Sequence, residues 1–374
     1  MKKVLFLIHD LGPGGAEKVL VNLVKNMDPK EYDITVMALF GGGVNEQFLA
    51  SHVRYIACFK RMIPGNSHLM KLLTPKQLHK WLIKDKYDIE ISYLEGPSAR
   101  IISGCPDDTT KLLSWIHCKM TPEVAVLGFR SMQEAKACYN RLDRIVCVSK
   151  TVEDAFQAVL QPESAPCVVY NTNESDKIIE KSVETVPEGV FREGETRLCA
   201  VGKLIPVKAY DRLVRIHARL RREGYPVHTY LMGVGALQAE LEKQIEEEQI
   251  ADSFTLLGYQ TNPYKFEKNC DIFVCSSLSE GFSTAATEAL IVGTPVCTVE
   301  VSGMKEMLGE NNEYGTVTEN SEDALYEGIK KLLDDPALLA HYKAQAVIRG
   351  KDFSTENTVR AVQDLLLEVC HESH

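Results

Sequence analysis

The sequence predicts an α/β protein of two domains, each built on a doubly wound parallel sheet of the Rossmann-like kind. Its 374 residues are long for one core and suit two. Apolar strands alternate with amphipathic helices in two successive series, and this order requires parallel pairing of the strands. Between the two series the chain becomes polar and loses its periodicity. These observations predict a first domain at 1–172, a linker at 173–196 and a second domain at 197–355.

The first series opens with a buried strand at Val4–Ile8. A glycine-rich turn follows, and then a helix over 16–27 whose apolar residues recur on one face. Further strands of this series are expected at 34–39, 89–93, 112–116, 145–148 and 168–170. In the second series strands are expected at 198–201, 227–232, 254–257, 272–276 and 295–299, and helices at 211–223, 237–249 and, at the end of the chain, 356–369.

The composition is that of an ordinary globular protein, with 45% hydrophobic and 25% charged residues. The net charge of −10 is uneven, because residues 1–171 carry 21 Lys and Arg against 18 Asp and Glu, whereas the remainder carries 21 against 34. An acidic half of this kind argues against general nucleic-acid binding. The 11 cysteines show no Cys-x-x-Cys or metal-ligand spacing, which favours reduced thiols in the cytoplasm.

The most informative pattern lies around Glu280. This residue stands in a glycine-containing loop after an apolar strand, and Glu288 lies about one and a half turns into the helix that follows. A strand, a loop of small residues and a helix N-terminus together offer free backbone N–H groups and a positive dipole end to a phosphate. An anion site flanked by two carboxylates suits a nucleotide-sugar better than a free nucleotide.

The stretch from Glu280 to Ala289 resembles the signature of the retaining glycosyltransferases of family 4, which have the GT-B fold. That resemblance implies two Rossmann-like domains facing a central cleft, with a C-terminal helix (about 356–374) crossing back to the N-terminal, acceptor-binding domain. It also implies roles for the signature residues. Glu280 would bind the transferred sugar and Glu288 the ribose. The backbone around the loop would bind the phosphate and sugar through Gly281, Phe282, Ser283 and Thr284.

Two lysines follow the first strand of the second series. Lys203 and Lys208 are similar to the family's diphosphate clamp, in which fixed cations stabilise the charge of the leaving group. The family usually has Arg at the first place and Gly after the second cation. Here Lys203 keeps the charge without bidentate geometry, and Ala209 replaces the glycine.

Three more positions of the second half resemble donor-site residues. Gly233 and Gly235 match the turn that lines the donor cleft, and Tyr259 lies in a segment whose backbone reads the base. Tyr259 either stacks on that base or is a surface tyrosine of a turn. The chain has no Asp-x-Asp, the usual metal-ligand motif of the other large glycosyltransferase fold. We therefore expect no cofactor and no required metal, because lysines and a helix dipole can neutralise the leaving group.

In the first half, Gly14 and Gly15 resemble the glycine loop that lies beside the donor phosphates and the acceptor. His117 ends a strand where the family carries a histidine near the donor sugar. It either hydrogen-bonds the sugar or acceptor, or is a satisfied core histidine. Ser149-Lys150 and Tyr170-Asn171 also match family turns, although Thr172 stands where proline is usual.

Residues 60–84 form a basic segment without an acidic residue. It carries interleaved leucines and Trp81, together with Lys60, Arg61, Lys71, Lys76, Lys80 and Lys84. This composition suits an anionic membrane surface, and equally an ordinary helix with a solvated lysine face. The opening apolar run is too short for a signal peptide, and no stretch is long enough to span a membrane. A cytoplasmic protein is expected, and on the first of these two interpretations the segment would contact the inner face of the cell membrane.

The resemblance covers nearly the whole chain. It implies a retaining transferase that moves a sugar from a nucleotide-diphosphate sugar, UDP favoured, to a lipid-linked or polysaccharide precursor. Covalent and same-face mechanisms both remain open. Alternatives are a catalytically silent partner subunit of another transferase, which intact Lys203, Lys208, Glu280 and Glu288 argue against, and a GT-B sugar-nucleotide epimerase or a phosphorylase. A dehydrogenase would need a Gly-x-Gly-x-x-Gly turn after a strand, which Gly12–Gly15 does not supply.

Overall fold

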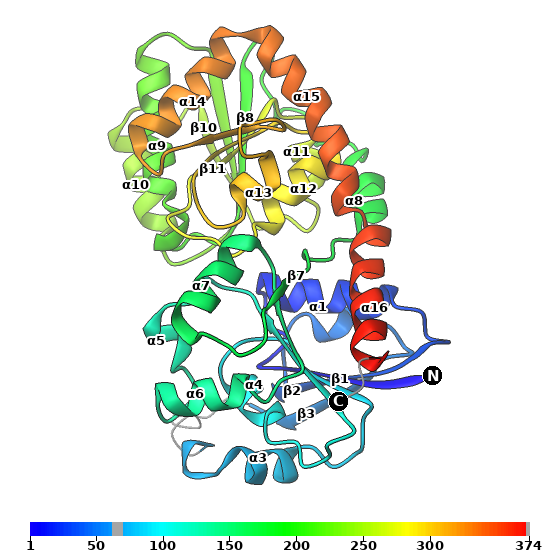
Figure 1. The fold of residues 1–374 in the computed structure, drawn as a ribbon. Coiled ribbons are helices and arrows are strands. Elements are labelled where there is room, and N and C mark those ends of the chain that lie inside the picture. Colours follow the sequence, from blue (N-terminus) through cyan, green and yellow to red (C-terminus); the bar gives the residue numbers. More distant parts are fainter. Residues whose placement is uncertain (62–69, 372–374) are drawn as a thin grey trace. The chain divides into compact units, whose positions relative to one another are not determined.

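The structure is a computed structural model that describes residues 1–61 and 70–371 (Figure 1). The chain divides into two units. The first comprises Met1–Asn173 together with Thr355–His374, and the second comprises Glu174–Ser354. Within the described parts of the chain, no helix combines the length and the apolar character that crossing a membrane requires.

The first unit contains a seven-stranded parallel sheet in the order β3-β2-β1-β4-β5-β6-β7. Its strands are β1 (Lys2–Ile8), β2 (Tyr32–Phe40), β3 (Arg54–Phe59), β4 (Ile89–Ser92), β5 (Lys111–Ile116), β6 (Arg144–Cys147) and β7 (Cys167–Val168). Its helices are α1 (Gly15–Asn26), η1 (Glu46–Phe48), α3 (Pro75–Leu82), α4 (Pro97–Ile102), α5 (Pro122–Ala125), α6 (Met132–Tyr139), α7 (Lys150–Leu160) and α16 (Thr355–His371).

The second unit repeats the design with a six-stranded parallel sheet in the order β10-β9-β8-β11-β12-β13. Its strands are β8 (Thr196–Val201), β9 (Val227–Met232), β10 (Phe254–Gly258), β11 (Ile272–Cys275), β12 (Val296–Val299) and β13 (Thr316–Thr318). Its helices are α8 (Ser175–Ser182), η2 (Pro206–Lys208), α9 (Tyr210–Arg222), α10 (Gln238–Glu247), α11 (Tyr264–Glu267), α12 (Thr284–Val292), α13 (Met304–Leu308), α14 (Glu322–Asp334), α15 (Pro336–Gly350) and η3 (Lys351–Phe353).

Both sheets reverse their strand order at an interior position. In the first unit β1 lies between β2 and β4, and in the second unit β8 lies between β9 and β11. The loops that leave β1 and β4 therefore run to opposite faces of their sheet, and so do those that leave β8 and β11. A doubly wound sheet opens a crevice at the carboxyl ends of such strands, which is where ligands bind in this architecture.

The α/β fold class with two parallel sheets is confirmed. The returning helix is confirmed as well, since α16 packs with α1 in the first unit (Figure 1). Its Glu368 pairs with Arg144 at 3.4 Å, and Tyr32 Oη donates to the Gln363 carbonyl at 3.5 Å. Thr355 Oγ1 donates to the carbonyl of Asn173 at 2.8 Å. This bond joins the last residue of the first chain segment of the unit to the first residue of its second segment.

The segment 173–196, expected to be a linker, is partly helical. Residues Ser175–Ser182 form α8, which belongs to the second unit and packs against α11 and α12. Only Ile178 among its apolar residues is fully buried, and Ile179 is 48% exposed. Two helical turns with one buried apolar position carry too little periodicity to be recognised from the sequence.

Candidate active site

The candidate site of the second unit lies at the carboxyl ends of β8 and β11, where the strand order reverses. The loop after β8 carries Lys203 and Lys208, and the loop after β11 carries Glu280. A small hollow at this edge is lined by residues of both loops and of the strands beneath them. The polar members of this lining are Lys208, Tyr210, Ser276, Ser277, Glu280 and Ser283.

Lys208 and Glu280 form an ion pair at the centre of this edge. Lys208 Nζ lies 2.6 Å from Glu280 Oε1, and the side chains are only 24% and 11% exposed. Ser277 Oγ donates to the same carboxylate oxygen at 2.6 Å. The structure thus brings together a cation and a carboxylate that lie 72 residues apart in the sequence.

The two loops are also joined through their main chains. Leu278 N–H donates to the Val207 carbonyl at 2.8 Å, and Ser276 Oγ donates to the Lys208 carbonyl at 2.9 Å. The buried guanidinium of Arg212 donates to the Ser276 carbonyl. Sequence reasoning missed Arg212, because an arginine in an amphipathic helix reads as a surface residue until its burial is known.

The N-terminus of α12 follows Glu280 by three residues. Ser283 caps it, with its side chain accepting from Ala286 N–H at 3.3 Å, and Thr287 Oγ1 donates back to the Ser283 carbonyl at 2.9 Å. Gly281, Phe282, Ser283 and Thr284 therefore form the entry to a capped helix, as the sequence predicts. Helix N-termini carry unsatisfied N–H groups and a positive dipole end, which makes this the expected phosphate position.

Glu288 has a different setting from Glu280. It is buried in α12, and one of its carboxylate oxygens accepts a hydrogen bond from Tyr264 Oη at 3.3 Å. Tyr264 lies in the same segment as Tyr259, which resembles the base-reading segment of the family, but its contact with Glu288 was not predicted. Nothing in the spacing of the two residues, 24 positions apart, signals their contact.

The loop after β9 lies directly against the loop after β8. At Gly233, whose φ is +151°, an added Cβ would stand 1.8 Å from the Gly202 carbonyl oxygen, so only glycine fits. Gly235 approaches the Leu204 backbone in the same way. Lys203 in the neighbouring loop is exposed, and Tyr259, after β10, is 72% exposed. Both exposed side chains stand free of the core.

In the first unit the candidate residues lie at the carboxyl ends of β1 and β5. Gly14 is the N-cap of α1, and Gly15 is its first residue. The turn before them is fixed by Asp10, whose Oδ1 accepts from Gly12 N–H at 2.7 Å, and by Asn45, whose Nδ2 donates to the Gly12 carbonyl. Sequence reasoning missed Asp10 and Asn45, since polar residues after strands are common.

His117 follows β5 and stacks at a tilt against Tyr93, with ring centroids 4.9 Å apart. Desolvation lowers its pKa to about 3, so the imidazole is neutral at neutral pH. Its Nε2 atom is buried and has no hydrogen-bond partner among the described residues. The ring can therefore give or accept one neutral hydrogen bond, and it is not a satisfied core histidine.

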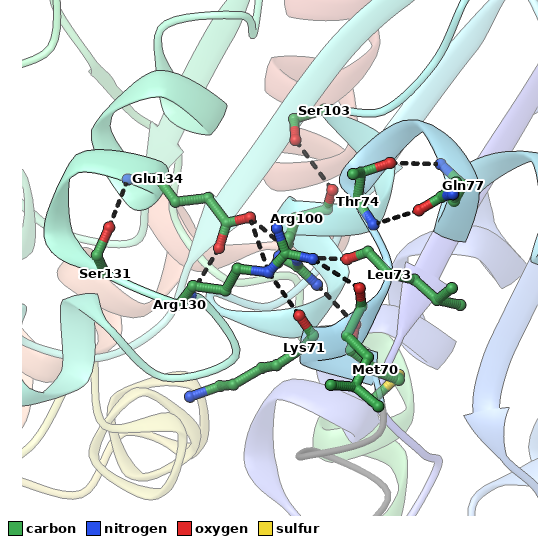
Figure 2. A network of polar contacts seen from close by, with 11 residues as sticks. Met70, Lys71, Leu73, Thr74, Gln77, Arg100, Ser103, Arg130, Ser131 and Glu134 are labelled. Atoms are coloured by element: carbon green, nitrogen blue, oxygen red, sulfur yellow. Dashed lines mark hydrogen bonds and ion pairs between the residues drawn. The ribbon is translucent and has the colours of Figure 1, made fainter.

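The basic segment 60–84 is described except for residues 62–69. Two arginines hold its middle part, as Figure 2 shows. Arg100 donates to the carbonyls of Met70 and Leu73 at 3.0 and 2.7 Å, and Arg130 donates to those of Lys71 and Leu72 at 2.5 and 2.8 Å. Glu134 links the two, accepting from Arg100 at 2.9 Å and from Arg130 N–H at 2.6 Å.

Helix α3 follows this clamp and begins with a capping box of Thr74 and Gln77. Leu78 and His79 are buried, whereas Trp81 is 45% exposed. The exposed positions also include Lys76, Lys80 and Lys84. The helix therefore packs one face on the unit and turns a basic face with one large aromatic ring towards solvent.

Two family models match the chain, one on each half. The model described as Glycosyltransferase Family 4 matches residues 13–172, and that described as Glycosyl transferases group 1 matches residues 182–348. The chain belongs to the family 4 type of glycosyltransferases. The resemblance stated from the Glu280 motif is thereby confirmed.

Known relatives support this family over the full chain. A Campylobacter jejuni protein named N-acetylgalactosamine-N,N'-diacetylbacillosaminyl-diphospho-undecaprenol 4-alpha-N-acetylgalactosaminyltransferase is 27% identical over 381 residues, covering 98% of this chain and 100% of that protein. The crystal structure of Anabaena HepE with UDP covers 98% of this chain and 100% of its own, with a TM-score of 0.77 and 19% identity. WaaG, involved in lipopolysaccharide biosynthesis, covers 97% and 99%, with a TM-score of 0.74 and 15% identity. The fold of this glycosyltransferase is GT-B.

Ala209 provides a test of the loop geometry. It adopts φ +49° and ψ +46°, a left-handed conformation that costs an L-residue about 1 kcal/mol or more. We expect Ala209→Gly to stabilise the protein by about 1 kcal/mol and raise Tm by roughly 2 °C in calorimetry. Ala218→Gly, inside α9, is the matched control and should lower Tm. A lower Tm for Ala209→Gly would contradict the loop conformation.

Proposed function

We propose that this glycosyltransferase uses a UDP-sugar donor, retains the anomeric configuration, needs no metal and acts on a lipid-linked or polysaccharide precursor. The observation that carries the proposal is the Lys208–Glu280 pair at the strand-order reversal of the second unit, beside the N-terminus of α12. This arrangement offers a carboxylate for sugar hydroxyls next to a cation and a dipole for a diphosphate.

Lys208 has donors to spare for the diphosphate. Its ammonium group carries three N–H donors, and Glu280 accepts one of them. The remaining donors, together with the exposed Lys203 and the N-terminus of α12, would contact the two phosphates. Negative charge grows on the leaving UDP as the bond between the sugar's anomeric carbon and the phosphate oxygen breaks, and fixed positive groups stabilise that charge. The same groups would replace a divalent metal.

Glu280 would orient the transferred sugar through its hydroxyl groups. Its Oε1 already accepts from Lys208 and Ser277, and its carboxylate has acceptor capacity left for a hydroxyl. His117, neutral in its desolvated setting, would donate or accept a hydrogen bond with sugar or acceptor. In same-face attack, the acceptor oxygen bonds to the anomeric carbon while its proton passes to the departing phosphate, so no separate protein base is needed.

The relatives favour this donor and acceptor class. The name of the Campylobacter jejuni relative specifies an undecaprenol-diphosphate-linked acceptor, and HepE was crystallised with UDP and with UDP-glucose. A full-length match to both types of protein supports a UDP-sugar donor and a lipid-linked acceptor for this chain.

We also propose that α3 contacts the anionic face of the membrane that holds such an acceptor. Its exposed lysines would pair with lipid headgroups, and Trp81 would enter the interface. The Arg100–Glu134–Arg130 clamp fixes the segment from which α3 starts, so the basic face has a defined direction in the first unit.

The role of Glu280 is tested by Glu280→Gln, which keeps the size of the side chain and removes its charge. Transfer should fall by about 100-fold or more, as for loss of one preorganised transition-state contact. UDP binding, measured by thermal shift, should be at least as strong, because Lys208 is released for the phosphates. Glu240→Gln, an exposed site on α10, serves as the control. Transfer within twofold of the unaltered protein would exclude this role.

The membrane contact is tested by replacing Lys76, Lys80 and Lys84 with glutamine. Each lysine near an anionic surface contributes about 1 kcal/mol, so partition onto phosphatidylserine vesicles should fall more than tenfold. The control replaces Lys2, Lys3 and Lys30, which are exposed in the same unit and carry the same charge. If both triple variants co-sedimented equally with the vesicles, the proposed membrane contact of α3 would be wrong.

A further inference from the structure

Glu95 occupies a fixed turn at the carboxyl end of β4. The next residue, Gly96, has φ +83°, and an added Cβ there would lie 2.9 Å from the Leu127 carbonyl oxygen. Gly96 N–H donates to the hydroxyl of Tyr139, itself a fully buried residue, at 3.3 Å. Close packing on one side and a buried hydrogen bond on another leave this turn little freedom to move.

Both carboxylate oxygens of Glu95 are used by the end of the neighbouring strand. Oε2 accepts from His117 N–H at 3.0 Å, and Oε1 accepts from the Cys118 thiol at 3.1 Å. Strands β4 and β5 pair in parallel up to Ser92 and Ser114, so these contacts continue the connection beyond the last ladder pair. A half-buried carboxylate therefore replaces the missing main-chain acceptor where the two strands diverge.

This contact determines where the His117 ring lies. The His117 main chain is held by Glu95, and the ring is held against Tyr93, which belongs to the same β4 end. These two contacts come from one rigid turn and fix the positions of both the His117 main chain and its ring. The buried Nε2 then keeps a constant direction without a protein hydrogen-bond partner among the described residues.

We propose that Glu95 is a positioning residue that acts through His117, holding the imidazole in the orientation that the transferase reaction requires. The role of His117 in transfer rests on the proposed function. The contact between Glu95 and His117 does not depend on that function. Glu95 is not one of the residues that the sequence pattern singles out.

The Cys118 thiol reports on the contact independently of activity. Burial first, and then the adjacent Glu95 charge, raise the pKa of this thiol above its ordinary value. Glu95→Gln keeps an oxygen for His117 N–H but removes the charge beside the thiol. We expect iodoacetamide to label Cys118 several-fold faster at pH 8 in this variant, because loss of the Glu95 charge lowers the pKa of the thiol and raises its thiolate fraction.

Peptide mass spectrometry measures this labelling with an internal reference. Cys58 on β3 is likewise half-buried, and burial alone raises its pKa to about 11, so its labelling rate should not change. Glu163→Gln, an exposed carboxylate of the same unit, should leave both rates unchanged. An unchanged Cys118 rate in Glu95→Gln would contradict the contact.

A double-mutant cycle with His117→Ala then tests the positioning role. Glu95→Ala, which removes the acceptor of His117 N–H, should alone lower kcat by about tenfold, with little change in KM for the donor and an unaltered thermal shift with UDP. In the His117→Ala background it should change kcat less than twofold, because there is no imidazole left to position. An equal loss in both backgrounds would show that Glu95 acts independently of His117 and would overturn the proposal.

A parent protein without any transfer would instead refute the proposed function, while the labelling result would still decide the contact.

Discussion

The Lys208–Glu280 ion pair is the interaction on which the candidate site depends. A carboxylate that binds sugar hydroxyls beside a diphosphate would repel that diphosphate by about 4 kcal/mol at a separation near 4 Å and an effective dielectric constant of 20. In the proposed function Lys208 would remove this conflict, because its ammonium group contacts Glu280 and has further donors that a phosphate could accept. Ser277 on the same oxygen fixes the carboxylate further.

This pair is possible because the sheet order reverses between β8 and β11. Loops from the two strands leave in opposite directions, and main-chain hydrogen bonds then bind them to each other. Ala209 adopts an unfavourable backbone conformation directly after Lys208, and buried Arg212 secures the Ser276 carbonyl. The scaffold thus sustains local strain in order to keep the ion pair in one geometry.

Much of this could be predicted from the sequence. Strands such as β1, with its buried apolar run Val4–Ile8, alternate with amphipathic helices, so the parallel sheets could be predicted from the pattern. The half-exposed edge strand β3, the three-residue β13 and the short helix α8 gave no comparable pattern and were missed. The Glu280 loop and Lys208 were identified through a motif, since such short segments carry recognisable residue types at fixed spacing.

The missed site residues share a physical cause. Arg212 and Glu95 act through contacts with partners far along the chain, and their own surroundings in sequence resemble those of ordinary surface positions. Only burial and distance distinguish them, and neither can be read from one sequence. The same holds for the Arg100–Glu134–Arg130 clamp, which joins segments about 30 residues apart.

Nucleotide release from a panel of UDP-, GDP-, ADP- and TDP-sugars in the presence of EDTA, with thermal shifts for the free diphosphates, would test both the proposed UDP-sugar donor and the proposed independence of metal. We expect release from a UDP-sugar that EDTA leaves unchanged, and stronger stabilisation of the protein by UDP than by the other diphosphates. No release from any donor and no stabilisation by UDP would contradict it, and would favour a catalytically silent partner subunit.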